Sequence, residues 1–213
     1  MTWEEMKESW ENQENLGEFA DYCLKDSALA LNLADEIVPQ ITELSKLVGT
    51  IPFDTCRLTY GQLTENFLLR EAYSRKILAP NRPSQQKRKD RRREGAYAGG
   101  FVYTPDSGLY ENIALFDFRS LYPTVMVAHN ISPDTLNLDE CSERFTLEEF
   151  DYDFCQDEQG FFPELIEGLV EERYEIKNKM KDKEEGTAEY QGLYNRQQAE
   201  KILANSFYGY LGY

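Results

Sequence analysis

A carboxylate follows a short apolar run in the middle of this chain, at Asp117. The four residues before it, 113–116, are apolar and favour a buried strand. A carboxylate at the end of a strand is costly to bury unless it is paired or binds a metal, so Asp117 is a candidate ligand for metal-assisted phosphoryl transfer. Ser120, Leu121 and Tyr122 follow in a turn whose clustered amides suit phosphate oxygens. A strand followed by a surface aspartate is the alternative interpretation.

Two expected helices in the final third carry a second set of candidate residues. One helix is expected from 160 to about 183, and another from about 188 to 207 with an end at Gly209. Their short connection predicts an antiparallel hairpin. At a rise of about 1.5 Å per residue, Arg173 and Lys201 would lie at the same height on neighbouring helices.

Cations gather on this predicted hairpin, because Lys177 lies one turn from Arg173 on the same helical face. The second helix places three residues on one face, at i, i+4 and i+7: Lys201, Asn205 and Tyr208. Clustered cations suit a triphosphate, and Tyr208 with Gly209 suits a flat base pair. Ordinary surface charge on a helical pair is the alternative.

A basic segment at 87–93 has six Lys or Arg residues in seven positions. Tyr97, Gly99 and Gly100 follow it, and this combination suits contact with a sugar-phosphate strand. For the basic segment a solvated charged loop or helix end remains open, and for the glycine residues a plain turn. The chain as a whole has 23 basic and 39 acidic residues and a formal charge of -16. This net negative charge argues against a protein that binds nucleic acid through its overall electrostatic field.

Composition indicates a folded chain, because 41% of its 213 residues are hydrophobic. This length allows one large domain or two small ones. The sequence has no apolar run long enough to span a membrane and no signal peptide, so a cytoplasmic location away from membranes is expected. Four cysteines without a Cys-x-x-Cys pair and a single histidine make a zinc site unexpected.

Residue patterns predict further elements around these candidates. Residues 3–20 favour a helix or helix-loop, and apolar residues recur at helical spacing over 19–48, where Pro39 should kink or divide the helix. The other expected elements are a helix over 58–79, a hairpin of strands at 101–103 and 113–116, a short helix at 124–129, and an irregular, exposed stretch over 139–158.

Four motifs stand in an order that resembles a family B DNA polymerase of the archaeal type. Asp117–Pro123 resembles the first palm motif of that family, and Lys201–Gly209 its fingers motif. Tyr97–Gly100 resembles its Tyr-x-Gly-Gly element, and Tyr22–Asp26 its third exonuclease motif, Tyr-x-x-x-Asp.

The resemblance implies an α+β fold. It would comprise a partial polymerase palm of antiparallel strands, a long antiparallel fingers helix hairpin and an N-terminal helical remnant of a 3'-5' exonuclease domain. The implied divisions are 1–48 for the exonuclease remnant, 49–95 for a helical and basic linker, 96–156 for the partial palm, 157–209 for the fingers, and 210–213 for the return to the palm.

The resemblance also implies roles in the palm. Asp117 would ligate two catalytic Mg2+ ions and the Phe118 carbonyl one of them. The amides of Ser120, Leu121 and Tyr122 would hold the incoming triphosphate. The Tyr122 ring would pack under the sugar and exclude a 2'-hydroxyl.

Other roles fall on the fingers and the exonuclease remnant. Arg173 and Lys201 would bind the β and γ phosphates of the dNTP, with Lys177 as a further contact, and Lys201 would help to protonate the leaving pyrophosphate. Asn205, Tyr208 and Gly209 would line the nascent base pair. Tyr97, Gly99 and Gly100 would touch the DNA strand. Asp26 would be an exonuclease metal ligand, with Tyr22 orienting the attacking water.

The sequence contains no Asp-Thr-Asp, the core of the family's second palm carboxylate motif. We therefore expect this chain alone neither to extend primers nor to degrade DNA. Its expected partners are primer-template DNA, dNTPs and a second polymerase polypeptide that supplies the rest of the palm and the thumb. A split subunit, an interrupted gene and a trimmed fragment all remain open, as does a non-catalytic nucleotide- or DNA-binding module derived from a polymerase.

Cys141 and Cys155 occupy places where some members of this family from very hot habitats carry a disulfide. We expect reduced thiols here, as is usual in a cytosol.

Overall fold

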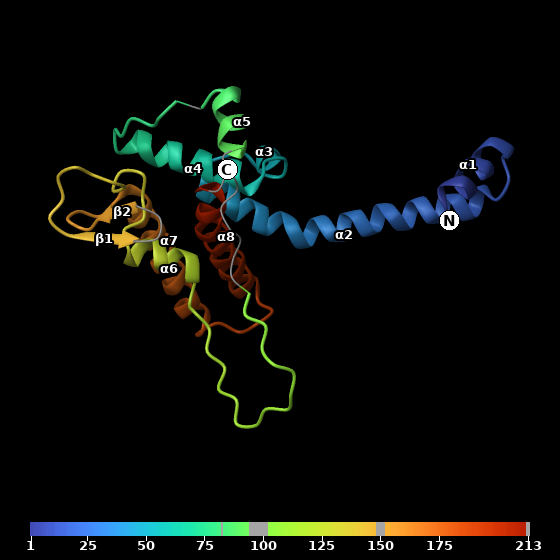
Figure 1. The fold of residues 1–213 in the computed structure, drawn as a ribbon. Coiled ribbons are helices and arrows are strands. Elements are labelled where there is room, and N and C mark those ends of the chain that lie inside the picture. The colour runs from blue at the N-terminus through green and yellow to red at the C-terminus, as the bar shows by residue number, and fades with distance from the viewer. Residues whose placement is uncertain (82, 94–101, 148–151, 212–213) are drawn as a thin grey trace. The chain divides into compact units, whose positions relative to one another are not determined.

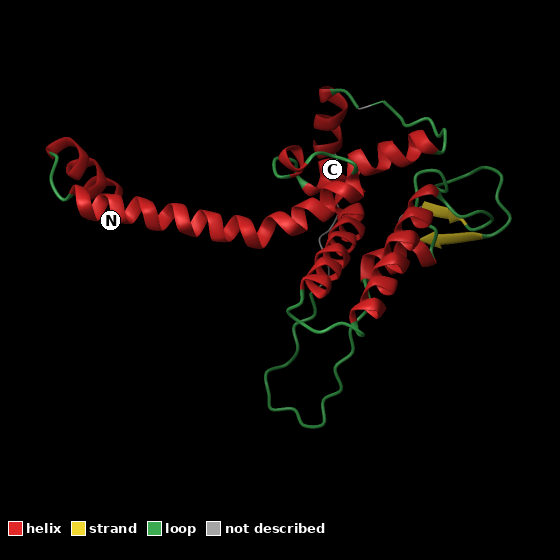
Figure 2. Cartoon of the chain, turned by 180° about the vertical axis from the view of Figure 1, so that it is seen from behind, coloured by secondary structure: helices red, strands yellow, loops and turns green. Residues whose placement is uncertain are grey.

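The computed structural model describes residues 1–81, 83–93, 102–147 and 152–211. This part of the chain is mostly helical and contains one two-stranded antiparallel sheet (Figures 1 and 2). The elements in chain order are α1 (Trp3–Asn12), α2 (Leu16–Val48), α3 (Pro52–Thr55), α4 (Tyr60–Ser74), α5 (Gln85–Arg93), α6 (Leu121–Ala128), β1 (Arg144–Leu147), β2 (Tyr152–Cys155), α7 (Phe161–Met180) and α8 (Ala188–Leu211). None of these helices combines the length and the apolarity needed to span a bilayer.

The chain divides into two units. The larger unit comprises residues 1–67 and 120–213, and the smaller one comprises residues 68–119. The larger unit holds the core, in which α7 and α8 pack against each other and against α6, while α8 also packs against α2.

Aromatic contacts mark the centre of that core. The ring of Phe207 in α8 is fully buried and makes edge-to-face contacts with Phe67 at 6.1 Å and Phe162 at 5.8 Å between centroids. Ile166 of α7 is equally buried, and Leu203 lies one turn before Phe207 with 1% exposure. The apolar faces of α7 and α8 therefore form the centre of the core.

Helix α2 runs for 33 residues and passes through Pro39. The expected division at this proline is wrong. Proline removes the hydrogen bond to the carbonyl four residues earlier, but Pro39 lies on the exposed side of α2, where water can satisfy that carbonyl. At the start of the chain, where a helix or helix-loop is expected over 3–20, the structure has α1, a short loop and the beginning of α2. Thr2 and Glu5 close a capping box on α1.

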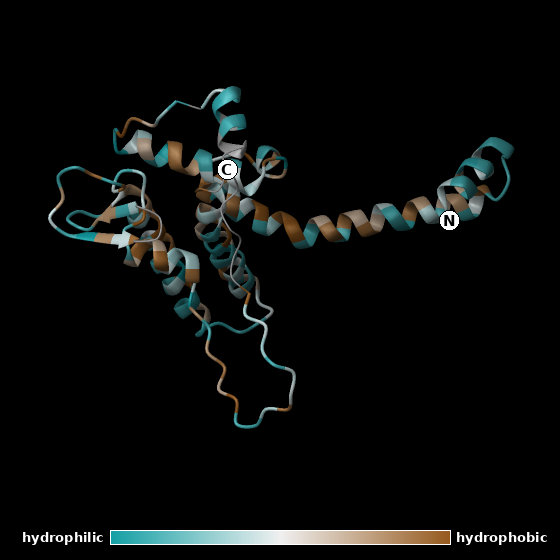
Figure 3. Ribbon diagram, in the orientation of Figure 1, coloured by the Kyte–Doolittle hydropathy of each residue, from teal (hydrophilic) through white to brown (hydrophobic). Residues whose placement is uncertain are grey.

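The strand hairpin expected at 101–103 and 113–116 is wrong in the part that the structure describes, because residues 102–103 and 113–116 have no regular structure. Phe101 lies outside the described residues. The side chains of Ile113, Leu115 and Phe116 are 72%, 94% and 90% exposed. Figure 3 shows hydrophobic stretches, in brown, along the irregular loop that leads into α6. A two-stranded hairpin needs further strands or a packed layer for stability, and these side chains remain mostly exposed.

The region 139–158 is not irregular as expected, because β1 and β2 pair in it with Arg144 opposite Cys155 and Leu147 opposite Tyr152. Arg144 also forms a 2.9 Å ion pair with Asp153 across the two strands. Strands of four residues are too short to show a clear alternating pattern, which explains why the sequence did not reveal them.

Cys141 and Cys155 form a disulfide, so the expectation of reduced thiols is wrong. The pairing of β1 with β2 brings the two residues to a Cα–Cα distance of 5.8 Å, which lies within the usual range for a disulfide. The other two cysteines, Cys23 and Cys56, are free and exposed.

The remaining helices lie close to their expected bounds. Helix α4 is shorter than the expected 58–79, and α6 begins at Leu121 rather than 124. Helix α8 continues through Gly209 to Leu211. A glycine costs a helix only about 1 kcal/mol relative to alanine, which is too little to end α8 where its preceding turn is packed into the core.

A buried amide joins the loop after α6 to the start of α7. The side-chain NH2 of Asn130 donates to the carbonyls of Cys155 at 2.6 Å and Glu158 at 2.7 Å, and its oxygen accepts from the amide of Gly160 at 2.7 Å. Asn130 is 6% exposed, so these bonds satisfy a polar group that water hardly reaches. They fix the place at which α7 begins.

Candidate active site

The first turn of α6 presents backbone amides. Ser120 is its N-cap residue, with a left-handed φ of 51°, and its side chain makes no capping hydrogen bond. The first helical bond of α6 is donated by Thr124 to the Ser120 carbonyl at 2.9 Å, so the amides of Leu121 and Tyr122 have no acceptor within the helix. Amides of this kind, together with the helix dipole, favour an anion.

The ring of Tyr122 stacks on the ring of Tyr208, with 4.1 Å between centroids and an interplanar angle of 12°. The two rings come from the start of α6 and from the last turns of α8, and they are 47% and 40% exposed. The structure therefore brings together the residues proposed separately for the sugar and for the base pair. Sequence reasoning missed this stack, because 86 positions separate the two tyrosines and no local spacing connects them.

The register of α7 and α8 follows from contacts at several heights. Arg173 donates through Nε to Gln197 at 3.2 Å, and Glu172 pairs with Arg196. Gln197 lies one turn before Lys201 in α8, so the expectation that Arg173 and Lys201 share a height is wrong by about one turn, or about 6 Å. The reason is the connection, whose middle lies near residue 184, between Met180 and Ala188, and not near 187.

The outer face of α8 has the expected composition. Lys201, Asn205 and Tyr208 are all exposed and share one side of an unbroken helix, and Gly209 is exposed beside Tyr208. Lys201 forms no ion pair with any residue that the structure describes, and the same holds for Lys177 on α7. Both ammonium groups are available to a ligand.

Asp117 and Phe118 belong to the smaller unit, and both are exposed in a stretch without regular structure. The expectation that Asp117 lies at the end of a strand is therefore wrong. Among the described residues, the one group of three metal-ligating side chains is Cys141, Cys155 and Asp157, and its two cysteines are bonded to each other. No group of this kind includes Asp117 within the described ranges.

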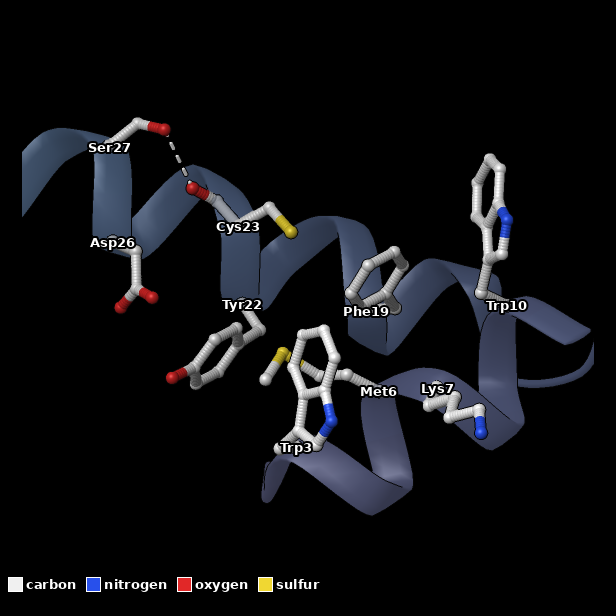
Figure 4. Close-up of a pocket in the computed structure, with 9 residues that line it drawn as sticks. All are labelled: Trp3, Met6, Lys7, Trp10, Phe19, Tyr22, Cys23, Asp26 and Ser27. Carbon is white, nitrogen blue, oxygen red and sulfur yellow. Dashed lines mark hydrogen bonds between the residues drawn. The ribbon is translucent and has the colours of Figure 1, made fainter.

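Tyr22 and Asp26 lie one turn apart on α2 and line a pocket of about 540 Å3 between α1 and α2 (Figure 4). The Asp26 carboxylate raises the pKa of the Tyr22 phenol, because ionisation would place two negative charges side by side. Four of the nine residues that line the pocket are aromatic, and both tryptophans of the chain, Trp3 and Trp10, are among them.

Comparison with known proteins gives one family. The model of DNA polymerase family B matches residues 55–213. The DNA polymerase of Thermococcus sp. (strain 9oN-7) is 47% identical over 210 residues, and that of Thermococcus gorgonarius is 46% identical over 210 residues; each alignment covers 99% of this chain and 27% of the relative. The structure of the family B DNA polymerase from the hyperthermophilic archaeon Pyrobaculum calidifontis matches with a TM-score of 0.69 and 32% identity, over 86% of this chain and 24% of that one.

The chain belongs to DNA polymerase family B. It spans about a quarter of the length of the archaeal relatives it matches. The family expected from the four motifs is confirmed, and the family B model begins in α3 and continues through α8.

Three of the candidate residues of this family B chain, Tyr97, Gly99 and Gly100, lie outside the described residues. The basic segment before them belongs to α5, where Lys87 and Lys89 are exposed. The alternative interpretations of this segment were a charged loop and a helix end, and in the structure its residues belong to a helix.

A buried acid in α8, Glu200, was not among the candidates. Its carboxyl is 1% exposed, and burial together with the charge of Glu172 raises its pKa to about 8. The sequence held a signal for it, because Glu200 precedes Leu203 and Phe207 by three and seven positions and so lies on the apolar face of the family B helix.

Proposed function

We propose that this chain is part of a DNA-directed DNA polymerase that binds primer-template DNA and an incoming dNTP for template-directed nucleotidyl transfer. The observation that carries the proposal is the stack of Tyr122 on Tyr208. The stack joins residues 120–123, the part of the first palm-like motif that lies in the larger unit, to the fingers-like motif of α8 in the same unit. Each of these two motifs resembles a polymerase motif independently of the other.

The amides at the start of α6 and the cations of the α7–α8 hairpin would hold the triphosphate. Leu121 and Tyr122 offer backbone amides that have no acceptor within the helix. The backbone amide of Ser120, at the start of the same turn, would be a third donor to the triphosphate. Lys177 and Lys201 offer exposed ammonium groups, and both suit the β and γ phosphates.

Arg173 donates through Nε to Gln197, and its guanidinium carries further N–H donors that suit the β and γ phosphates. Lys201 would also donate a proton to the leaving pyrophosphate, since an ammonium group held against the leaving oxygens can act as a general acid.

The ring of Tyr122 would lie under the sugar of the dNTP and exclude a 2'-hydroxyl by its bulk. Tyr208 fixes the plane of that ring by stacking on it. Asn205 and Gly209 are exposed on either side of Tyr208 along α8 and would line the nascent base pair.

Asp117 and the Phe118 carbonyl fit part of a magnesium site, because Mg2+ takes oxygen ligands and often binds through one or two carboxylates together with substrate phosphates. Bound there, Mg2+ would offset the negative charge of the phosphate oxygens. One carboxylate and one carbonyl do not suffice for two ions, and we propose that a second polypeptide supplies the further carboxylates of the Asp-Thr-Asp motif that this sequence does not contain.

The reaction would be the in-line attack of a primer 3'-hydroxyl on the α phosphorus of the dNTP. The described residues would contribute by orienting the triphosphate and the sugar, which lowers the entropic cost of reaching that alignment. We propose that the chain is inactive without a second polypeptide carrying the other carboxylates and a thumb. Tyr22 and Asp26 would be exonuclease residues that also need partners from elsewhere.

Reconstitution tests this proposal. The chain is mixed with a polypeptide that carries the second palm carboxylate motif and a thumb, and primer extension is measured with Mg2+ and dNTPs. We expect primer extension only when both polypeptides are present. Asp117→Ala should abolish extension, whereas Asp106→Ala, at an exposed aspartate of the same unit, should retain it. A mixture that binds dNTPs without extending primers would support the non-catalytic module, and equal activity of Asp117→Ala would refute the role of Asp117.

A further inference from the structure

Glu200 is a carboxylic acid in the core of the larger unit. Its side chain is 1% exposed, and Oε2 has no hydrogen-bond partner. It lies on the face of α8 that also carries Leu203 and Phe207, both buried. A polar atom without a partner at such a depth is costly, and a charge there is much more so.

Two charged groups act on this acid. Glu172 reaches it from α7, and Arg196 lies one turn before it on α8. Burial raises the pKa of Glu200 most, Glu172 raises it further and Arg196 lowers it, with a result of about 8. Helix α6 has no charged residue, and Glu43 and Lys46 near the packed end of α2 are paired with each other at 2.6 Å. Glu200 is therefore protonated and neutral at pH 7.

The same arginine is the partner of Glu172. Its Nη2 donates to Glu172, and this pair joins α8 to α7. The side chains of Arg196 and Glu172 are 53% and 40% exposed, so water screens their attraction. One guanidinium thus faces two carboxyl groups, of which one is exposed and charged and the other is buried and neutral.

We propose that Glu200 is a proton-operated latch of the α7–α8 hairpin, a contact between the two helices that its protonation state controls. While its carboxyl is protonated, Arg196 bridges the two helices through Glu172. When the proton is released to solvent, Arg196 turns back along α8 to Glu200 and the bridge opens. The direction follows from burial. An unpaired charge in the core is disfavoured far more strongly than an exposed ion pair is favoured, so Arg196 leaves Glu172 for the newly charged Glu200.

Nuclear magnetic resonance of the whole chain tests the latch. Glutamate carboxyl carbons and the arginine Nε–H groups are followed from pH 5 to pH 10, with Glu200→Gln and Arg196→Lys used to assign the two signals. We expect the Glu200 carboxyl to titrate with a midpoint near 8 and the Arg196 Nε–H to shift with the same midpoint. Glu172→Gln removes the like charge and should lower that midpoint, whereas Glu171→Gln, an exposed neighbour on α7, should leave it unchanged.

Each outcome decides the matter. A Glu200 midpoint near the ordinary 4.5 would overturn the proposal, and so would an Arg196 signal that stays constant through the Glu200 titration. If Glu200→Gln does not fold, the wild-type titration still gives the answer, because Glu172→Gln identifies the Glu200 signal by displacing it. The test needs no polymerase activity, so it stands or falls separately from the proposed function.

Discussion

The buried acid of α8 makes the stability of the chain depend on pH in a direction opposite to that of an ordinary paired carboxylate. In the folded chain the pKa of Glu200 is about 8, and its ordinary value is 4.5. Between these values the folded chain keeps a proton that the unfolded chain has released, so stability is fully present below about pH 4.5 and is lost as pH rises through about 8.

The size of the effect follows from the same two values. Each pH unit in this range removes about 1.4 kcal/mol from the free energy of unfolding, and the loss between pH 6 and pH 9 amounts to about 2.5 kcal/mol. Glu200→Gln cannot ionise and lacks this dependence. The variant should therefore gain about 2.5 kcal/mol relative to wild type between pH 6 and pH 9.

Urea unfolding followed by far-ultraviolet circular dichroism measures this difference. Wild type and Glu200→Gln are compared at several pH values, so that all other titrating groups cancel. Glu171→Gln serves as the matched control, since this carboxylate is exposed on α7 and its removal should give a difference that does not change with pH. A wild-type minus Glu200→Gln difference that is flat across pH 6 to 9 would refute the reasoning.

Three further predictions follow from the structure. In the reconstituted polymerase, Tyr122→Ala should admit ribonucleotides, and unchanged sugar discrimination in a primer-extension assay would contradict the role of this ring. Phe207→Ala should cost about 3–5 kcal/mol because it empties the centre of the core, whereas Phe53→Ala, at a ring that is 65% exposed, should cost much less; urea unfolding compares them. Reducing the disulfide between Cys141 and Cys155, which closes a loop with a sequence separation of 14, should lower the free energy of unfolding by about 3 kcal/mol; an unchanged melting temperature with reductant would disprove this.

Helices were predictable from the sequence because their signals are local. Apolar residues at helical spacing and the glycine and proline residues around 160 gave α7 and α8 within a few positions. The strand predictions failed because a strand depends on a pairing partner elsewhere in the chain. The apolar run 113–116 suggested a strand that the described structure lacks, and the four-residue strands β1 and β2 carried no recognisable pattern.

The candidate site divides in the same way. The motifs showed which residue types were present, and the shared face of Lys201, Asn205 and Tyr208 followed from one helical period. The relative height of Arg173 and Lys201 did not, because it depends on where the connection between the helices turns. The stack of Tyr122 on Tyr208 depends on the packing of α6 against α8, which no spacing within either segment encodes.

The position of the two tryptophans has a practical consequence for optical work on this chain. Trp3 and Trp10 both lie on α1, and they are 74% and 64% exposed. Tryptophan fluorescence therefore reports on the packing of α1 against α2 and is insensitive to changes in the core around Phe207. The stacked phenol rings of Tyr122 and Tyr208 should instead give a near-ultraviolet dichroic band, which makes tyrosine the better chromophore for following a bound nucleotide.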